Sequence, residues 1–280
     1  MLTFNLGPLP LPIAYFLLLV ALLVAAGVGR WVGRRQQTGV GNVLIDMLLA
    51  AMLVARIAFV AVWFDTYRSA PWSMLDLRDG GFIPWAGVLA ALLLAIWRAW
   101  RRPLLRKPLT FGLLAGVLAG GGLFGAIRMM DNTALPSTSL TTLTGASTDL
   151  AALAQGKPMI VNLWATWCPP CRREMPVLAA AQKREGGMRF VFVNQGEDGA
   201  TAQRYLAAAG LDLANVVMDR GAGMGREVGS GALPTTLFYD ANGRLVDTHL
   251  GALSTASLEH KLNRLRAPAQ PLAGTVPGGK

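Results

Sequence analysis

The sequence predicts a four-helix transmembrane α domain followed by a smaller α/β domain. Residues 1–130 are strongly apolar and contain four stretches close to the ~20 residues that a membrane-spanning helix needs. From residue 140 onward, short apolar segments alternate with helical ones, as they do in α/β folds. We therefore expect a membrane domain over 1–130, a linker over 131–139, the α/β domain over 140–266 and a flexible Pro/Gly-rich tail over 267–280.

The four expected spans cover residues 11–29, 43–64, 82–97 and 109–127, and the third is the shortest. The first has neither a basic segment before it nor a small-residue cleavage site after it, so we expect it to be retained. The loops after the first and third spans are basic and hold no acidic residue, whereas the loop between the second and third carries three aspartates. By the positive-inside rule, the basic loops are cytoplasmic and the α/β domain lies outside.

The net charge of +10 belongs mostly to these loops, because residues 1–130 hold 12 basic and 4 acidic side chains. It therefore reflects membrane topology, and the expected partner is the lipid bilayer and not a nucleic acid. The resulting localisation is a bacterial inner membrane, crossed several times, with the α/β domain in the periplasm.

The chain has only two cysteines, Cys168 and Cys171. A bridge between them would close a very short loop and add little stability through chain entropy, which favours a chemical role. No metal is expected, because zinc needs about four ligands and His249 and His260 lie far downstream. A strand over 159–164 leads into the pair, and a helix over 169–184 follows it.

Cys168 is expected at the N-terminus of that helix, where free N–H groups and the helix dipole favour a thiolate. Pro169 is tolerated in a first helical turn, and Cys171, one turn further in, should be less exposed. We therefore expect Cys168 to attack a disulfide of a partner and Cys171 to resolve the mixed disulfide.

The stretch from Gly156 to Pro176, with Cys168-Pro169-Pro170-Cys171 at its centre, resembles the membrane-tethered, TlpA-like branch of the thioredoxin superfamily. The resemblance covers about residues 140–266. It implies a thioredoxin-like fold, a redox-active Cys168–Cys171 disulfide and no cofactor. A second matching stretch, from Gly231 to Asp240, implies that the peptide bond between Leu233 and Pro234 is cis and that Pro234 contacts bound substrate. The active-site rim would comprise Trp167, Pro169, Pro170 and Leu233.

Two positions near the cysteines refine this hypothesis. Ordinary thioredoxins carry a buried aspartate six residues before the first cysteine, and this chain has Asn162 there. Glu174 matches a carboxylate that is functional in cytochrome-maturation relatives. Because i and i+3 share a helix face, it could exchange a proton with Cys171. The alternative is a solvated glutamate that the helix dipole favours.

In the first half, Arg56 falls within the second expected span, and an arginine inside a membrane is a functional candidate. Its alternatives are snorkelling or pairing, although Asp46 is ten residues away, too far for a contact within one helix. Gly112, Gly116 and Gly120 permit close helix approach, either within the bundle or in a dimer.

The stretch from residue 55 to residue 87 also resembles part of a prolipoprotein diacylglyceryl transferase. The whole resemblance covers about residues 40–127. The histidine of that family is missing where this chain has Trp85-Ala86-Gly87, and its arginine motif is replaced by residues 122–125. The resemblance therefore implies a degenerate relative that serves as an anchor or a partner-binding bundle.

These features predict a membrane-anchored reductase of disulfide-bearing client proteins such as apocytochrome c. The membrane half has no cysteine, so a separate membrane thiol electron donor is expected. The alternatives are an oxidase that introduces disulfides, a lipoprotein-modifying transferase with an accessory redox domain, and a thiol-regulated scaffold.

Overall fold

The computed structural model describes residues 3–6, 9–34, 39–68, 71–76, 80–130 and 134–266. The expected tail over 267–280 and the first three residues of the expected linker lie outside the described residues. Residues 134–139 run without helix or strand to the first strand of the α/β domain. The domain boundaries given above stay predictions.

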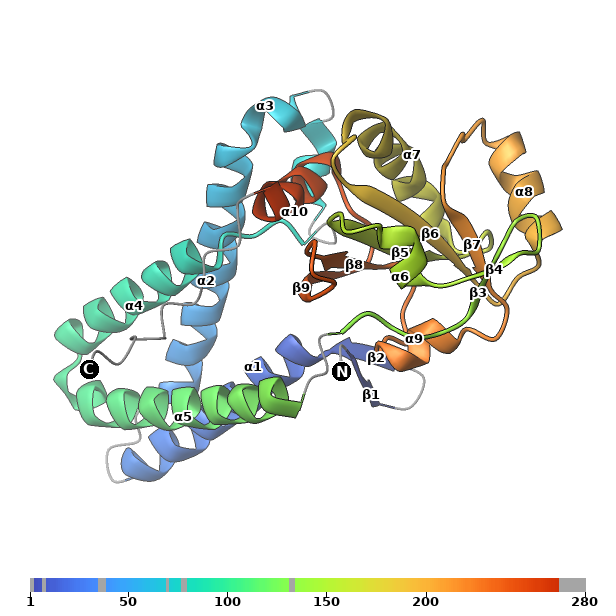
Figure 1. Ribbon diagram of the computed structural model, residues 1–280. Helices are drawn as coiled ribbons and strands as arrows, with labels where there is room; N and C mark the ends of the chain where they lie inside the picture. Colours follow the sequence, from blue (N-terminus) through green and yellow to red (C-terminus); the bar gives the residue numbers. More distant parts are fainter. Residues whose placement is uncertain are drawn as a thin grey trace, which may run out of the picture.

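The first half is built from long helices (Figure 1). A two-stranded ribbon, β1 and β2, precedes them, and the short helix α3 follows α2. The bounds are β1 (Thr3–Leu6), β2 (Leu9–Pro12), α1 (Ile13–Val32), α2 (Val40–Val62), α3 (Phe64–Tyr67), α4 (Pro84–Arg101) and α5 (Arg106–Met130), with 3-10 turns at Pro71–Leu75 and Pro103–Leu105. Three helical segments, Ile13–Val32, Val40–Val62 and Pro103–Ile127, are long and apolar enough to cross a membrane. The fourth helix, α4, has 18 residues and two arginines in its last turn.

Glycines let these helices approach each other closely. A Cβ on Gly112 would lie 2.6 Å from the carbonyl oxygen of Ala25, and one on Gly116 would lie 2.7 Å from that of Ala21, so α5 packs directly on α1. Of the two interpretations of this glycine spacing, the structure shows packing within the bundle. Helix α4 lies along α2 (Figure 1) and is joined to it by an ion pair between Arg98 and Asp46 at 2.5 Å.

The second half is a seven-stranded sheet in the order β4-β3-β7-β6-β5-β8-β9, in which β5, β6 and β7 are parallel. Its strands are β3 (Leu140–Thr142), β4 (Ser147–Thr148), β5 (Met159–Trp164), β6 (Arg189–Gln195), β7 (Val216–Asp219), β8 (Thr235–Tyr239) and β9 (Leu245–Leu250). Its helices are α6 (Leu150–Ala154), α7 (Pro169–Arg184), α8 (Gly199–Ala208), α9 (Gly223–Glu227) and α10 (Thr255–Arg266). This is a thioredoxin-like α/β domain.

Strand β5 lies between β6 and β8, and all six of its residues are buried. Successive side chains of a strand point to opposite faces, and here Ile160 and Trp164 join the core beneath α7 and α10. Val161 and Leu163 join the second core, on the other face. Strand β5 is thus packed on both faces, and the turn that follows it places Cys168 at one end of α7.

Candidate redox site

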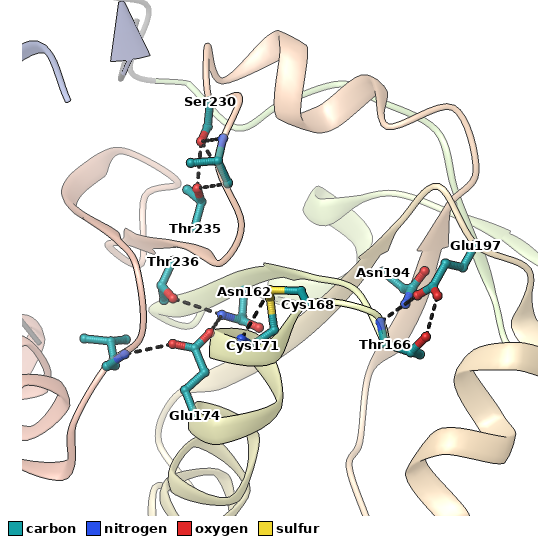
Figure 2. Close-up of a disulfide and its surroundings, with 12 residues drawn as sticks. Asn162, Thr166, Cys168, Cys171, Glu174, Asn194, Glu197, Ser230, Thr235 and Thr236 are labelled. Atoms are coloured by element: carbon teal, nitrogen blue, oxygen red, sulfur yellow. Dashed lines mark hydrogen bonds between the residues drawn. A yellow bond between two sulfur atoms is a disulfide. The ribbon is translucent and has the colours of Figure 1, made fainter. Parts of the chain in front are cut away.

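The two cysteines form a disulfide at the N-terminus of α7, with an S–S distance of 2.03 Å (Figure 2). Cys168 is the N-cap residue of the helix, and its Sγ accepts a hydrogen bond from the Cys171 N–H at 3.2 Å. Cys168 is 3% exposed and Cys171 is completely buried. The predicted positions of both residues are confirmed, and the free N–H groups of the first turn can stabilise a thiolate on Cys168.

The expected rim residues differ in exposure. Trp167 is 67% exposed although it directly precedes a buried cysteine, so its ring lies at the surface beside the disulfide. Pro169 is exposed in the first turn of α7, and Pro170 is half-buried. Trp164 is fully buried in the core and contacts Tyr205, so it packs and does not reach the rim.

The peptide bond between Leu233 and Pro234 is cis, as the resemblance implied. Pro234 is buried and directly precedes β8, the antiparallel neighbour of β5. Its carbonyl oxygen accepts a hydrogen bond from the Gly251 N–H at 2.9 Å. Leu233 is half-buried and packs against both hydrophobic cores.

Glu174 lies inside the protein, with 1% of its surface exposed, so the alternative of a solvated glutamate is wrong. One carboxylate oxygen accepts a hydrogen bond from the Asn162 side-chain amide at 2.8 Å, and the other accepts one from the Leu253 N–H at 2.9 Å (Figure 2). Burial raises the pKa of the Glu174 carboxyl to about 7, against the lowering effect of these two hydrogen bonds. The carboxyl can therefore gain and lose a proton near neutral pH.

Asn162 connects three elements. Its amide nitrogen donates to Glu174 on α7 and also to the Thr236 hydroxyl on β8, at 3.0 Å. The titratable group beside the disulfide is thus carried by α7 and not by β5. Sequence reasoning did not find Thr236 or Leu253. Leu253 contributes through its backbone, so its side chain gave no signal.

A second carboxylate, which the sequence did not reveal, fixes the turn before Cys168. Glu197 accepts hydrogen bonds from the Thr166 N–H at 2.8 Å, from the Thr166 hydroxyl at 2.5 Å and from the Asn194 amide at 2.6 Å (Figure 2). Glu197 follows β6 and Thr166 follows β5. Parallel strands end at the same edge of a sheet, so the strand pattern of the sequence could have indicated that these two residues lie close together.

Arg56 is 6% exposed, near the end of α2 that is followed by α3. Its guanidinium donates to backbone carbonyls of the loop between α3 and α4: Gly81 at 2.8 Å, Asp76 at 2.9 Å and Met74 at 3.0 Å. It also lies over the rings of Tyr67 and Phe82. The structure does not place Arg56 beside the disulfide. It holds a loop, and Asp46 pairs with Arg98 instead.

The fold and the buried cysteine pair define a thioredoxin-like thiol–disulfide oxidoreductase, and comparisons with known proteins agree. The Redoxin family model matches residues 130–264. The thiol-disulfide oxidoreductase ResA of Halalkalibacterium halodurans is 33% identical over 129 residues, which are 45% of this chain and 72% of ResA. The thiol:disulfide interchange protein DsbE of Pseudomonas fluorescens is 33% identical over 157 residues, 55% of this chain and 87% of DsbE.

A crystal structure of a putative DsbE from Chlorobium tepidum matches 48% of this chain and 97% of its own, with 26% identity and a TM-score of 0.44. By its sequence relatives, the chain belongs to the TlpA-like family of thiol–disulfide oxidoreductases. The resemblance of the membrane half to a transferase stays a prediction.

Proposed function

We propose that this protein is a membrane-anchored reductase that acts on disulfides of extracytoplasmic client proteins. The α/β domain would lie outside the inner membrane of a bacterium, with α1, α2, α4 and α5 as its multi-pass anchor. The observation that carries the proposal is Glu174, a buried carboxyl with a pKa of about 7 one helical turn beyond Cys171.

The exchange proceeds in two steps that transfer two electrons. The Cys168 thiolate attacks one sulfur of the client disulfide, forming a mixed disulfide and releasing a client thiolate that takes up a proton. Cys171 then gives its proton to Glu174, and its sulfur attacks Cys168. The Cys168–Cys171 disulfide forms, the second client thiolate leaves, and it is protonated in turn. The client disulfide is reduced and the cysteine pair is oxidised.

Glu174 also favours this direction of electron flow. A carboxylate close to Cys171 disfavours negative charge on the reduced cysteine pair, because like charges repel strongly at a buried site. Strong oxidants of this fold depend on the opposite effect, a stabilised reduced form. A destabilised reduced form lowers the reduction potential and makes the pair a better reductant.

The oxidised pair must be reduced again after each cycle. Cys168 and Cys171 are the only cysteines in the sequence, so no thiol relay can pass through α1, α2, α4 and α5. We therefore propose a separate membrane dithiol protein as the electron donor. The family resemblance supports apocytochrome c as one class of client.

The reduction potential of the full-length protein, measured by equilibration with glutathione or dithiothreitol, tests the direction of electron flow. We expect a value near that of thioredoxin, about −270 mV, and a rise of roughly 30 mV in Glu174→Gln. A value near the −120 mV or so of strong oxidants would establish the oxidase instead.

Variants of the two cysteines test their separate roles. We expect Cys168→Ser to abolish disulfide reduction, because the attacking thiolate is lost. Cys171→Ser should accumulate mixed disulfides with clients, detectable as adducts on non-reducing gels. Failure to trap any adduct would show that Cys171 is not the resolving thiol, and Cys168→Ser serves as the matched control without adducts.

A further inference from the structure

Among the described residues, two contacts between the α/β domain and the membrane half each involve one of the chain's two histidines. On α10, the His260 ring meets the edges of Phe59 and Trp63, with ring centroids 5.7 Å and 6.2 Å away. On β9, the His249 ring lies against Gly80, where a Cβ would come within 2.7 Å of its Cε1. Figure 1 shows α10 beside the end of α2 that carries α3.

The loop at the second contact is held from inside the membrane half. Arg56 donates a hydrogen bond to the Gly81 carbonyl at 2.8 Å. A Cβ on Gly81 would lie 2.8 Å from the Arg56 guanidinium and 2.5 Å from the Phe59 ring. Gly80 itself has φ +65°, a conformation that favours glycine. The position of Gly80 is therefore set by its backbone and by a buried arginine.

The other side of the contact leads directly to the redox site. His249 pairs with Thr236 across β8 and β9, and Thr236 hydrogen-bonds Asn162. Two residues after His249, the Gly251 N–H donates to the Pro234 carbonyl, and the Leu253 N–H donates to the Glu174 carboxylate, both at 2.9 Å. The segment 249–253 thus touches the membrane half at one end and Glu174 at the other.

We infer that the membrane half is a structural part of the redox site, with Arg56, Gly80 and His249 as positioning residues for thiol–disulfide exchange. Arg56 fixes the loop that contains Gly80, and Gly80 leaves room for the His249 ring. The segment 249–253 then positions the Leu253 N–H to donate to Glu174. This inference rests on the proton role proposed for Glu174. It adds that the membrane half sets the environment of that carboxyl.

A small movement of this segment is enough to affect Glu174. The Leu253 N–H is one of two donors to a carboxylate that water scarcely reaches, and a hydrogen bond weakens steeply with distance and angle. This hydrogen bond lowers the pKa of Glu174, so weakening the bond would raise that pKa further. The protonated form would then persist to higher pH, and fewer molecules could accept the Cys171 proton at neutral pH.

The test compares kcat/KM for reduction of a disulfide peptide across pH 5 to 9, with the full-length protein in nanodiscs. In Gly80→Ala, the added methyl group meets the His249 ring. We expect the pH at the midpoint of the profile to rise by about half a unit. This lowers kcat/KM roughly threefold at pH values below the midpoint. Arg56→Lys, which releases the loop without adding a group at the contact, should move it in the same direction. Both variants keep Glu174, the two cysteines and His249.

Gly41→Ala is the matched control, because no heavy atom lies within 4 Å of a Cβ at Gly41 on α2. Superimposable profiles for Gly80→Ala, Arg56→Lys and Gly41→Ala would overturn the inference. So would a shift that persists when Gly80→Ala is combined with Glu174→Gln, because it would not act through Glu174. Loss of the acidic limb in Glu174→Gln alone supports the proton role. A wild-type profile in that variant would refute the proton role, whatever Gly80→Ala does.

Discussion

At the scale of single residues, the ionisation of Glu174 affects both the stability of the fold and the proposed proton transfer. Its carboxyl has an ordinary pKa of 4.5, raised to about 7 in the folded protein, chiefly by burial. The folded state therefore holds a proton between pH 4.5 and 7 that the unfolded chain has already lost. By linkage, stability falls as the pH rises through this window, because ionisation then opposes folding.

Glu174→Gln should lack this contribution to the pH dependence. Between pH 4.5 and pH 7, the wild-type free energy of unfolding should fall by about 3 kcal/mol relative to that of the variant. Urea denaturation of the oxidised protein in detergent, followed by near-UV circular dichroism, measures both. Asp212→Asn, at an exposed position, is the control and should retain the wild-type slope. Parallel slopes for all three proteins would mean that Glu174 is not the titrating group.

Residues were predictable to the extent that their role depends on local sequence. Cys168 and Cys171 followed from their spacing and from the helix after them, and Glu174 followed from the family resemblance together with its position three residues after Cys171. The partners of Glu174 and Asn162 could not be predicted in the same way. Thr236 reaches Asn162 because β8 pairs with β5, and Leu253 reaches Glu174 from the turn after β9. Both lie more than 60 residues from Glu174 in the sequence.

At the scale of elements, the turn between β5 and α7 depends on a neighbouring strand. Glu197 after β6 accepts three hydrogen bonds from this region, two of them from Thr166. Glu197→Ala leaves the Thr166 N–H and the Asn194 amide without their acceptor, so we expect a loss of about 2 kcal/mol in stability. The loop before Cys168 should also loosen and slow the exchange.

Urea denaturation and disulfide reduction by the same samples check both expectations for Glu197→Ala. Asp212→Ala provides the comparison, because this exposed position should change stability by less than about 0.5 kcal/mol. Equal stability of the two variants would show that the hydrogen bonds of Glu197 are replaced by water at no cost.

The packing of α5 on α1 gives a second element-level prediction. Gly116→Ala places a methyl group 2.7 Å from the Ala21 carbonyl oxygen, so the two helices must separate. A Cβ on Gly121 would meet nothing within 4 Å, so Gly121→Ala should be tolerated. We expect the Tm in detergent to fall by several degrees in Gly116→Ala only. A larger loss in Gly121→Ala would indicate that the open glycine face contacts another molecule.

Long, strongly patterned elements were predicted well. The helix expected over 169–184 is α7 (Pro169–Arg184), and the strand expected over 159–164 is β5 (Met159–Trp164). Strands β3, β4 and β7 were missed because each has four residues or fewer, too short to show a period. The third expected span, 82–97, corresponds to α4 (Pro84–Arg101), whose last turn includes Arg98, the partner of Asp46.

At the scale of the whole molecule, the two halves have different compositions and yet are in contact. The apolar helices could be recognised from composition alone, and so could the basic loops at one end of them. The contact could not, because it joins Gly80 and Phe59 of the first half to His249 and His260, more than 150 residues later. A glycine in a loop and a histidine on a strand carry no signal of such pairing in a single sequence.

The membrane topology yields the last prediction. By the positive-inside rule, we expect the loops after α1 and α4 in the cytoplasm, and the loop before α4 with the α/β domain on the other side. In a Cys168→Ser, Cys171→Ser background, the chain has no cysteine, so single cysteines report their own location. Trp72→Cys and Asn242→Cys are at exposed positions on the predicted outer side, and Leu104→Cys is exposed on the inner side.

An impermeant maleimide applied to intact spheroplasts should label Trp72→Cys and Asn242→Cys, and it should label Leu104→Cys only after the cells are permeabilised. Labelling of Asn242→Cys from inside alone would place the cysteine pair in the reducing cytoplasm, where a reductase of extracytoplasmic clients has no substrate. Opposite locations for Trp72→Cys and Asn242→Cys would break the contact between Gly80 and His249, since a membrane would separate the two surfaces. The locations of Trp72→Cys and Asn242→Cys therefore test both the membrane topology and the contact through which the membrane half supports Glu174.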